Sequence, residues 1–146
     1  MVSEPTRTEA LKTIEVTGHS QGPKSTHVEA AGAEFVVGKE ASPLDYLLGS
    51  LAACIDVIGH MVARDHDVAL DDLDVHVEGD IDPAKYNGES PEPRAGFQSI
   101  RVRVAADADA DDQELRDWMD EVAERCPVAD NLRNASDLDV SVVHAA

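Results

Sequence analysis

The spacing of apolar residues changes several times along this 146-residue chain, and each change predicts an element of structure. Apolar and polar residues alternate in LKTIEVT (11–17) and in STHVEAAGAEFVVGKE (25–40), the period-two pattern of half-buried strands. The turn residues GHSQGPK separate these stretches, and Ala31-Gly32 divides the second into two short strands. The opening third is therefore predicted to form a β-meander.

A helical period begins after Ser42. This residue is a candidate N-cap, Pro43 suits the first helical position, and Asp45 completes a short capping box. Gly49 and Gly59 weaken the helix and are predicted to mark places where another backbone packs closely. The sequence predicts a long helix over 43–65, with an apolar stripe of Leu44, Leu47, Leu48, Leu51, Ile55, Ile58 and Val62.

The second half of the chain repeats both patterns. LDDLDVHVEGDID (70–82) and FQSIRVRVAAD (97–107) alternate as strands, joined by an exposed Pro- and Gly-rich loop (83–96). A helix is predicted over 111–125, with Leu115, Met119 and Val122 as its apolar stripe, and a short helix follows Pro127. LDVSVV (138–143) is predicted to form a final strand. The order β-β-β-α-β-β-α-α-β indicates an α+β protein, organised as a single domain over 1–146.

The charge of the chain restricts its partners. Thirty acidic residues against twelve basic ones give a net charge of -18, which disfavours nucleic acids and anionic membrane surfaces as partners. A hydrated acidic surface suits a salt-rich cytoplasm, so we expect a halophilic source. MVSEPTRTEALK lacks the apolar core of a signal peptide, and Asp56 interrupts the longest apolar stretch. We therefore expect a cytoplasmic protein without a membrane span.

Two cysteines are the candidates for chemistry. Cys54 falls on the apolar face of the long helix, where cysteine usually packs as a small hydrophobe. Cys126 precedes Pro127 and so falls at the N-cap of the short helix, where the helix dipole favours a thiolate. Packing and capping roles, and a working redox pair, are all consistent with this pattern. There is no Cys-x-x-Cys and no histidine at ligand spacing from either cysteine, so no metal and no cofactor is predicted.

The stretches SPLDYLLGSLAACIDVIGHMV (42–62) and AERCPVADNL (123–132) together resemble the OsmC/Ohr family of hydroperoxide-reducing proteins. The resemblance implies an OsmC-like fold: an intertwined homodimer whose curved antiparallel sheets wrap two long central helices, with active sites at the subunit interface. It also implies roles for the thiols. Cys54 would attack the peroxide and become a sulfenic acid, Cys126 would condense with it to a disulfide, and a dithiol reductant would restore both.

The chain departs from the peroxidases of that family in one respect. They use an arginine from the N-terminal strands, held by a glutamate in the first turn of the central helix, to lower the pKa of the first thiol. Here no arginine lies between Arg7 and Arg64, and Leu44 follows the proline, although Asp45 could replace the glutamate. The candidate cations are Lys24, Lys39, His19, His27 and Arg125.

Two functions are consistent with the sequence. The first is a thiol-dependent peroxidase that reduces organic hydroperoxides in defence against oxidative stress. Organic substrates are favoured because aromatic residues make up only 3% of the chain, which predicts an aliphatic pocket. The alternative is a non-enzymatic OsmC-like dimer that binds a small apolar or thiol-reactive ligand at the subunit interface.

Overall fold

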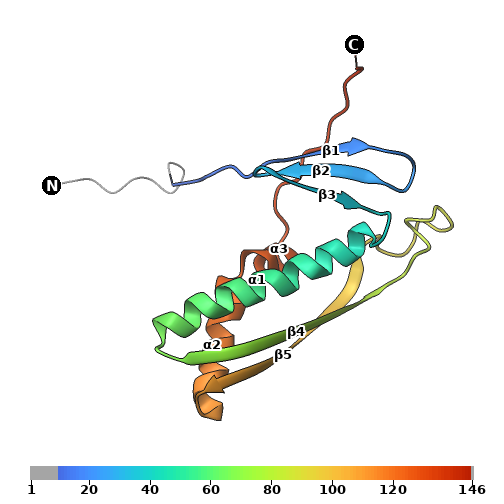
Figure 1. Cartoon of the computed structure of the whole chain (residues 1–146). Coiled ribbons are helices and arrows are strands. Elements are labelled where there is room, and N and C mark those ends of the chain that lie inside the picture. Colours follow the sequence, from blue (N-terminus) through green and yellow to red (C-terminus); the bar gives the residue numbers. More distant parts are fainter. Residues whose placement is uncertain (1–9, 146) are drawn as a thin grey trace. The chain divides into compact units, whose positions relative to one another are not determined.

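The structure, a computed structural model, describes residues 10–145 (Figure 1). They form two compact units that divide between Tyr46 and Leu47, and each unit is described by itself. The predicted α+β class is confirmed. That 1–146 is a single domain stays a prediction.

The first unit contains a three-stranded antiparallel sheet in the order β1-β2-β3. β1 (Val16–Ser20) pairs with β2 (Thr26–Ala30), which pairs with β3 (Ala33–Val37). The β2–β3 turn lies at Ala31-Gly32, as predicted. Both residues have positive φ, 51° and 82°, which is the backbone of a tight two-residue hairpin.

The first strand differs from the prediction of residues 11–17. β1 begins at Val16 and includes Gly18-His19-Ser20, which the turn residues had led us to place outside the strand. The reason is pairing: β2 offers five residues, and these pair with 16–20. Leu11 and Ile14 continue the apolar alternation, but they have no neighbouring strand among residues 10–46 and stay 77% and 80% exposed.

Helix α1 (Pro43–Asp65) has the predicted bounds, and its capping box is formed. The backbone N–H of Ser42 donates to the Asp45 carboxylate at 2.8 Å, and the N–H of Asp45 donates to the Ser42 hydroxyl at 3.1 Å. By length and composition alone α1 qualifies as a candidate membrane span, a property that core helices of soluble proteins share. Leu51, Ile55 and Val62 on this helix belong to the buried core.

The second unit packs α1 against a long hairpin and two further helices (Figure 1). β4 (Ala69–Ile81) and β5 (Phe97–Asp109) form the antiparallel hairpin, and the loop predicted between them is confirmed. α2 (Asp112–Arg125) and α3 (Pro127–Arg133) follow, also as predicted. The buried core is Leu51, Ile55, Val62, Ala63, Val68, Trp118, Val122, Cys126 and Ala129.

The predicted final strand at 138–143 is not formed. Leu138, Val140 and Val142 are 82–92% exposed, although they alternate with polar residues as a strand would. Alternation shows only that a segment could present one apolar face, and a strand also needs a neighbour with free backbone groups. Within the described residues of its own unit, this segment has no such neighbour.

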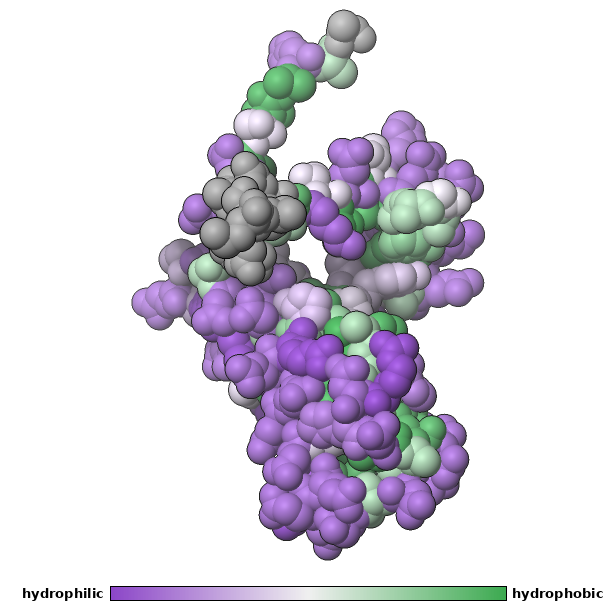
Figure 2. All heavy atoms as spheres, turned by 90° about the vertical axis from the view of Figure 1, so that its left-hand side faces the viewer, coloured by the Kyte–Doolittle hydropathy of each residue, from purple (hydrophilic) through white to green (hydrophobic). Residues whose placement is uncertain are grey.

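Hydrophilic residues cover most of the surface seen in Figure 2, as the charge of -18 leads us to expect, and hydrophobic residues interrupt it in separate patches. Besides Tyr46, three large apolar side chains of α1 are exposed: Leu47 at 38%, Val57 at 57% and Met61 at 38%. With Ser50 and Cys54 they recur at spacings of three and four, so this helix carries a second apolar stripe beside the buried one.

Candidate active site around Cys54 and Cys126

The site is built where α1 meets α2. Trp118 of α2 is 2% exposed, and its indole N–H donates to the Gly59 carbonyl of α1 at 2.8 Å. A Cβ atom on Gly59 would lie 3.0 Å from Trp118 Cζ2, so only glycine leaves full room for the ring. Gly59 therefore marks a close approach, as predicted, but the approaching group is a side chain. This contact fixes the helix that ends at Cys126 against the helix that carries Cys54.

Cys54 lies at the edge of the core rather than within it. It is partly exposed and packs against the buried cluster. Burial raises the pKa of its thiol. The backbone N–H of Val128 opposes this shift by donating to the sulfur, and the Cys126 thiol adds to the raised pKa. The two thiols therefore lie near each other, although they are 72 positions apart in the chain.

Cys126 occupies the corner between α2 and α3. It is the C-cap of α2 and the N-cap of α3, as predicted, and its sulfur accepts from the Ala129 N–H at 3.4 Å. Its exposure is 0%, and Pro127 begins α3 directly after it. Solvent cannot reach this thiol, so within the chain its available partner is Cys54.

Arg125, beside Cys126, is engaged in ion pairs with two carboxylates. Its guanidinium donates to Asp65 at the end of α1 (3.0 Å) and to Glu121 on α2 (2.8 Å), and both contacts raise its pKa. Glu121 also meets the imidazole of His66 at 3.3 Å. Arg125 thus links the ends of α1 and α2, and its supporting role at the first thiol stays a prediction.

The remaining candidates lie in the first unit. The Asp45 carboxylate accepts from the backbone and the hydroxyl of Ser42, and these bonds lower its pKa. His27 lies 3.7 Å from Glu34 and 4.0 Å from Glu29. No ion pair of Lys24 or Lys39 is found within residues 10–145. The structure thus brings the two cysteines together, whereas the supporting role of these four residues stays a prediction.

Comparison with known proteins identifies the family of the chain. The family model described as OsmC-like protein matches residues 37–141, which is most of the chain. The chain belongs to the OsmC family. No curated protein matches its sequence.

Solved structures of OsmC-like proteins are similar in fold. The OsmC-like protein from Mycoplasma pneumoniae is 20% identical, with a TM-score of 0.75 over 91% of this chain and 99% of that one. The organic hydroperoxide resistance protein OhrB of Bacillus subtilis is 18% identical, with a TM-score of 0.57 over 85% and 93% of the two chains. An organic hydroperoxide resistance protein from Legionella pneumophila is 21% identical, with a TM-score of 0.60 over 84% and 90%. At these identities the likeness establishes the OsmC fold.

Sequence reasoning missed three groups of the site in this OsmC-like protein. The Val128 N–H at the Cys54 sulfur is a backbone donor without a side-chain signature. Trp118 was left out of the predicted stripe of α2, although it is the only tryptophan and lies three residues after Leu115. The role of Asp65 could not be predicted, because acidic residues are abundant throughout the chain. Its ion pair with Arg125 depends on how the ends of α1 and α2 pack together.

Proposed function

We propose that this OsmC-like protein is a thiol-dependent peroxidase that reduces organic hydroperoxides. The observation that carries the proposal is the proximity of Cys54 and Cys126: one thiol is partly exposed, and the other is buried and lies near it. An exposed thiol can meet a substrate, and a second thiol beside it can capture the oxidised product. Membership of the OsmC family, with neighbours named organic hydroperoxide resistance proteins, supports a role in oxidative stress.

The proposed cycle has three balanced steps. The Cys54 thiol loses its proton, and the thiolate attacks the terminal peroxide oxygen of ROOH. The O–O bond breaks, the leaving alkoxide takes up a proton, and the products are Cys54 sulfenic acid and ROH. The Cys126 sulfur then attacks the sulfenic sulfur, and water leaves as the disulfide forms. A dithiol reductant finally returns both thiols by exchange and is itself oxidised to a disulfide. Such a cycle requires a compartment that keeps a reduced dithiol available, and we therefore place the protein in the cytoplasm.

Activation of Cys54 is the demanding step. The thiolate is the nucleophile, whereas burial raises the pKa of this thiol. Within the described residues, the Val128 N–H is the group that opposes this rise. An additional cation is therefore required for fast turnover, and Lys24, Lys39, His19, His27 and Arg125 stay its candidates. Loss of peroxide turnover in one of the five single alanine variants would identify it.

We also propose that the working unit is a homodimer. The second apolar stripe of α1, formed by Leu47, Ser50, Cys54, Val57 and Met61, repeats at the spacing of a helix–helix seam and is uncovered in the single chain. A second copy would cover it and would also provide a neighbour for the unpaired segment 138–143. Because Cys54 belongs to this stripe, the same contact would complete an aliphatic pocket at the thiol.

Thiol counting tests the peroxidase. Reduced protein is treated with one equivalent of cumene hydroperoxide, and free thiols and cumyl alcohol are measured. We expect both thiols to be lost and one alcohol to be formed per chain. In Cys126→Ser, Cys54 should stop at a sulfenic acid that dimedone traps, and Cys54→Ser should leave the peroxide intact. Thiols that survive excess hydroperoxide would refute the enzyme and favour the ligand-binding dimer.

A charge placed on the exposed stripe tests the dimer. Val57→Asp should shift the protein from dimer to monomer in analytical ultracentrifugation, because a dimer seam cannot cover an unpaired carboxylate without cost. Tyr86→Asp is the matched control, since Tyr86 in the β4–β5 loop is 56% exposed and Val57 is 57% exposed. A parent protein that sediments as a monomer, or two variants that behave alike, would contradict this proposal.

A further inference from the structure

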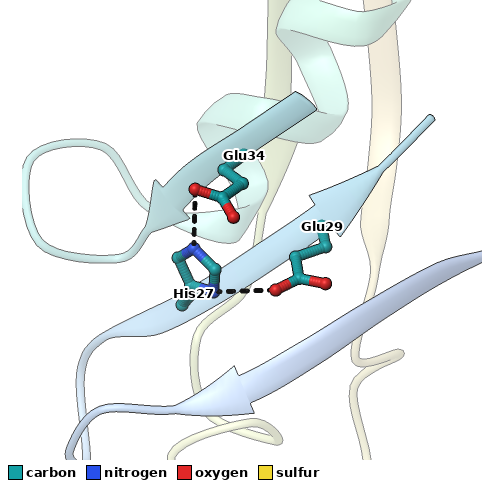
Figure 3. A group of neighbouring side chains, drawn as sticks. All are labelled: His27, Glu29 and Glu34. Atoms are coloured by element: carbon teal, nitrogen blue, oxygen red, sulfur yellow. Dashed lines mark ion pairs between the residues drawn. The ribbon is translucent and has the colours of Figure 1, made fainter. Parts of the chain in front are cut away.

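A second cluster of reactive side chains lies in the first unit, on one face of the β1–β2–β3 sheet. Residues two apart on a strand share a face, so His27 and Glu29 of β2 lie on the same side. Glu34 of β3 is the cross-strand partner of Glu29 and therefore belongs to that face. Figure 3 shows the imidazole of His27 between the two carboxylates, with Nδ1 facing Glu29 and Nε2 facing Glu34.

The arrangement is unfavourable without a further cation. Glu29 and Glu34 stand directly opposite each other on neighbouring strands, and like charges in that position destabilise a sheet. The contacts of His27, 4.0 Å to Glu29 and 3.7 Å to Glu34, are longer than hydrogen bonds, so the imidazole does not fully compensate them. Both carboxylates are about two-thirds exposed, whereas His27 is 26% exposed and held by the sheet.

We propose that His27, Glu29 and Glu34 form a binding site for a divalent transition-metal ion of the zinc class. One donor atom from each residue lies within 4.8 Å of the other two. Tetrahedral Zn²⁺, with bonds of about 2.1 Å, places its ligands ~3.4 Å apart, so rotations of two exposed glutamate side chains suffice. One imidazole nitrogen with two carboxylates suits zinc, nickel or cobalt rather than Mg²⁺ or Ca²⁺, which prefer oxygen ligands alone.

The surroundings leave room for the remaining ligands. A hollow of about 370 Å³ lies at this end of the sheet and is lined by Glu15, Thr17 and residues 29–34, including both glutamates. Water molecules in this hollow would complete the coordination of the ion. His19 is the cross-strand partner of His27 on β1, and its place on the same face makes it a side chain that could replace a water. The site involves neither cysteine.

Binding of the ion would have a structural consequence. The ion would neutralise the opposed carboxylates and tie β2 to β3, so the metal should stabilise this sheet by mass action. An acidic protein also attracts divalent cations without specificity, and the test therefore uses zinc in the presence of excess Mg²⁺. The two thiols can themselves ligate zinc, which requires a control of their own.

The experiment is calorimetric titration of the full-length reduced protein with Zn²⁺. We expect one ion per chain, with affinity reduced more than about tenfold in His27→Ala and in Glu34→Gln, since even outer-shell changes weaken metal sites ~10–100-fold. The exposed Glu34→Gln variant keeps the proposal testable if His27→Ala does not fold. His76→Ala is the matched control. Among the described residues, His76 of β4 forms an ion-pair contact with one carboxylate, Glu78, at 3.8 Å, so its loss should leave the zinc affinity unchanged.

Three results would overturn the site. The first is a parent protein that binds no zinc beside excess Mg²⁺. The second is equal affinity in the parent, Glu34→Gln and His76→Ala, which would indicate diffuse binding to the acidic surface. The third is loss of the tight site in Cys54→Ala with retention in Glu34→Gln, which would assign the ion to the thiols. Retention in Cys54→Ala and loss in Glu34→Gln supports the proposal.

Discussion

The contact between Gly59 and Trp118 holds the two cysteine-bearing helices together, and its strength can be measured. An alanine in place of Gly59 removes the helix penalty of glycine, a gain of about 1 kcal/mol. Its Cβ, however, would lie 3.0 Å from Trp118 Cζ2 and 3.3 Å from Leu73 Cδ2. The leucine methyl can rotate away, whereas the buried indole is held by its bond to the Gly59 carbonyl. The cost of overpacking is about 1–3 kcal/mol, so Gly59→Ala should destabilise the protein by ~0–2 kcal/mol.

A double-mutant cycle isolates this contact. Trp118→Phe should cost about 2 kcal/mol, because a buried hydrogen bond is lost and the smaller ring leaves space. That space lies where the methyl group introduced by Gly59→Ala must go, so the double variant should be ~1–2 kcal/mol more stable than the sum of the single changes predicts. Gly49→Ala is the control: beyond its neighbours and its own helix backbone, its Cβ would meet no atom of the described residues within 4 Å, and the helix gain of about 0.5–1 kcal/mol should appear undiminished.

The assay is urea unfolding followed by far-UV circular dichroism, since fluorescence would lose its only tryptophan in one variant. If the two single changes in unfolding free energy add up to that of the double variant within ~0.5 kcal/mol, Gly59 and Trp118 are not coupled through this contact, which would refute the prediction. If Gly49→Ala instead destabilises the protein, we would infer that a second copy packs against Gly49. Analytical ultracentrifugation would then detect the dimer.

The pKa of Cys54 is raised, so its alkylation rate should keep rising with pH beyond the ordinary range of cysteine, and a plateau already at pH 7 would contradict this. The Arg101 guanidinium and the Ser99 hydroxyl lower the pKa of Asp80 from 3.8 to about 2, so the stabilisation that the ionised carboxylate contributes is complete above pH 3.8 and is lost as pH falls through 2. In Arg101→Gln an NMR titration should find the pKa of Asp80 raised toward its ordinary value, with the Ser99 hydrogen bond still lowering it. The ion pair between Arg125 and Asp65 joins the ends of α1 and α2, so Arg125→Ala and Asp65→Asn should both slow disulfide formation after peroxide treatment. Unchanged rates would show that this ion pair is not needed to hold the two cysteines in place. Finally, the charge of -18 predicts that the melting temperature rises strongly with KCl, and a flat profile to molar salt would contradict this.

Most of the elements could be predicted because their causes are local. The bounds of α1 follow from Ser42, Pro43 and Asp45, which satisfy the first backbone donors of the helix within one turn. The corner at Cys126 follows similarly from Pro127, which suits a first helical position. The two errors concern strands. β1 was predicted too early, and the segment 138–143 was given a strand that it does not form, because alternation does not identify the neighbour that a strand requires.

The sequence by itself determined the helices, the turns, the charge and the positions of the two thiols along the chain, since caps, periodicity and composition act over a few residues. Only the tertiary structure decided that Cys54 and Cys126 lie near each other and that the Val128 N–H affects the pKa of the first thiol. It also decided that Arg125 forms an ion pair with Asp65. It likewise decided that His27 stands between Glu29 and Glu34. Distances between residues far apart in the chain, or on neighbouring strands, depend on how elements pack, and side-chain pKa values depend on those distances.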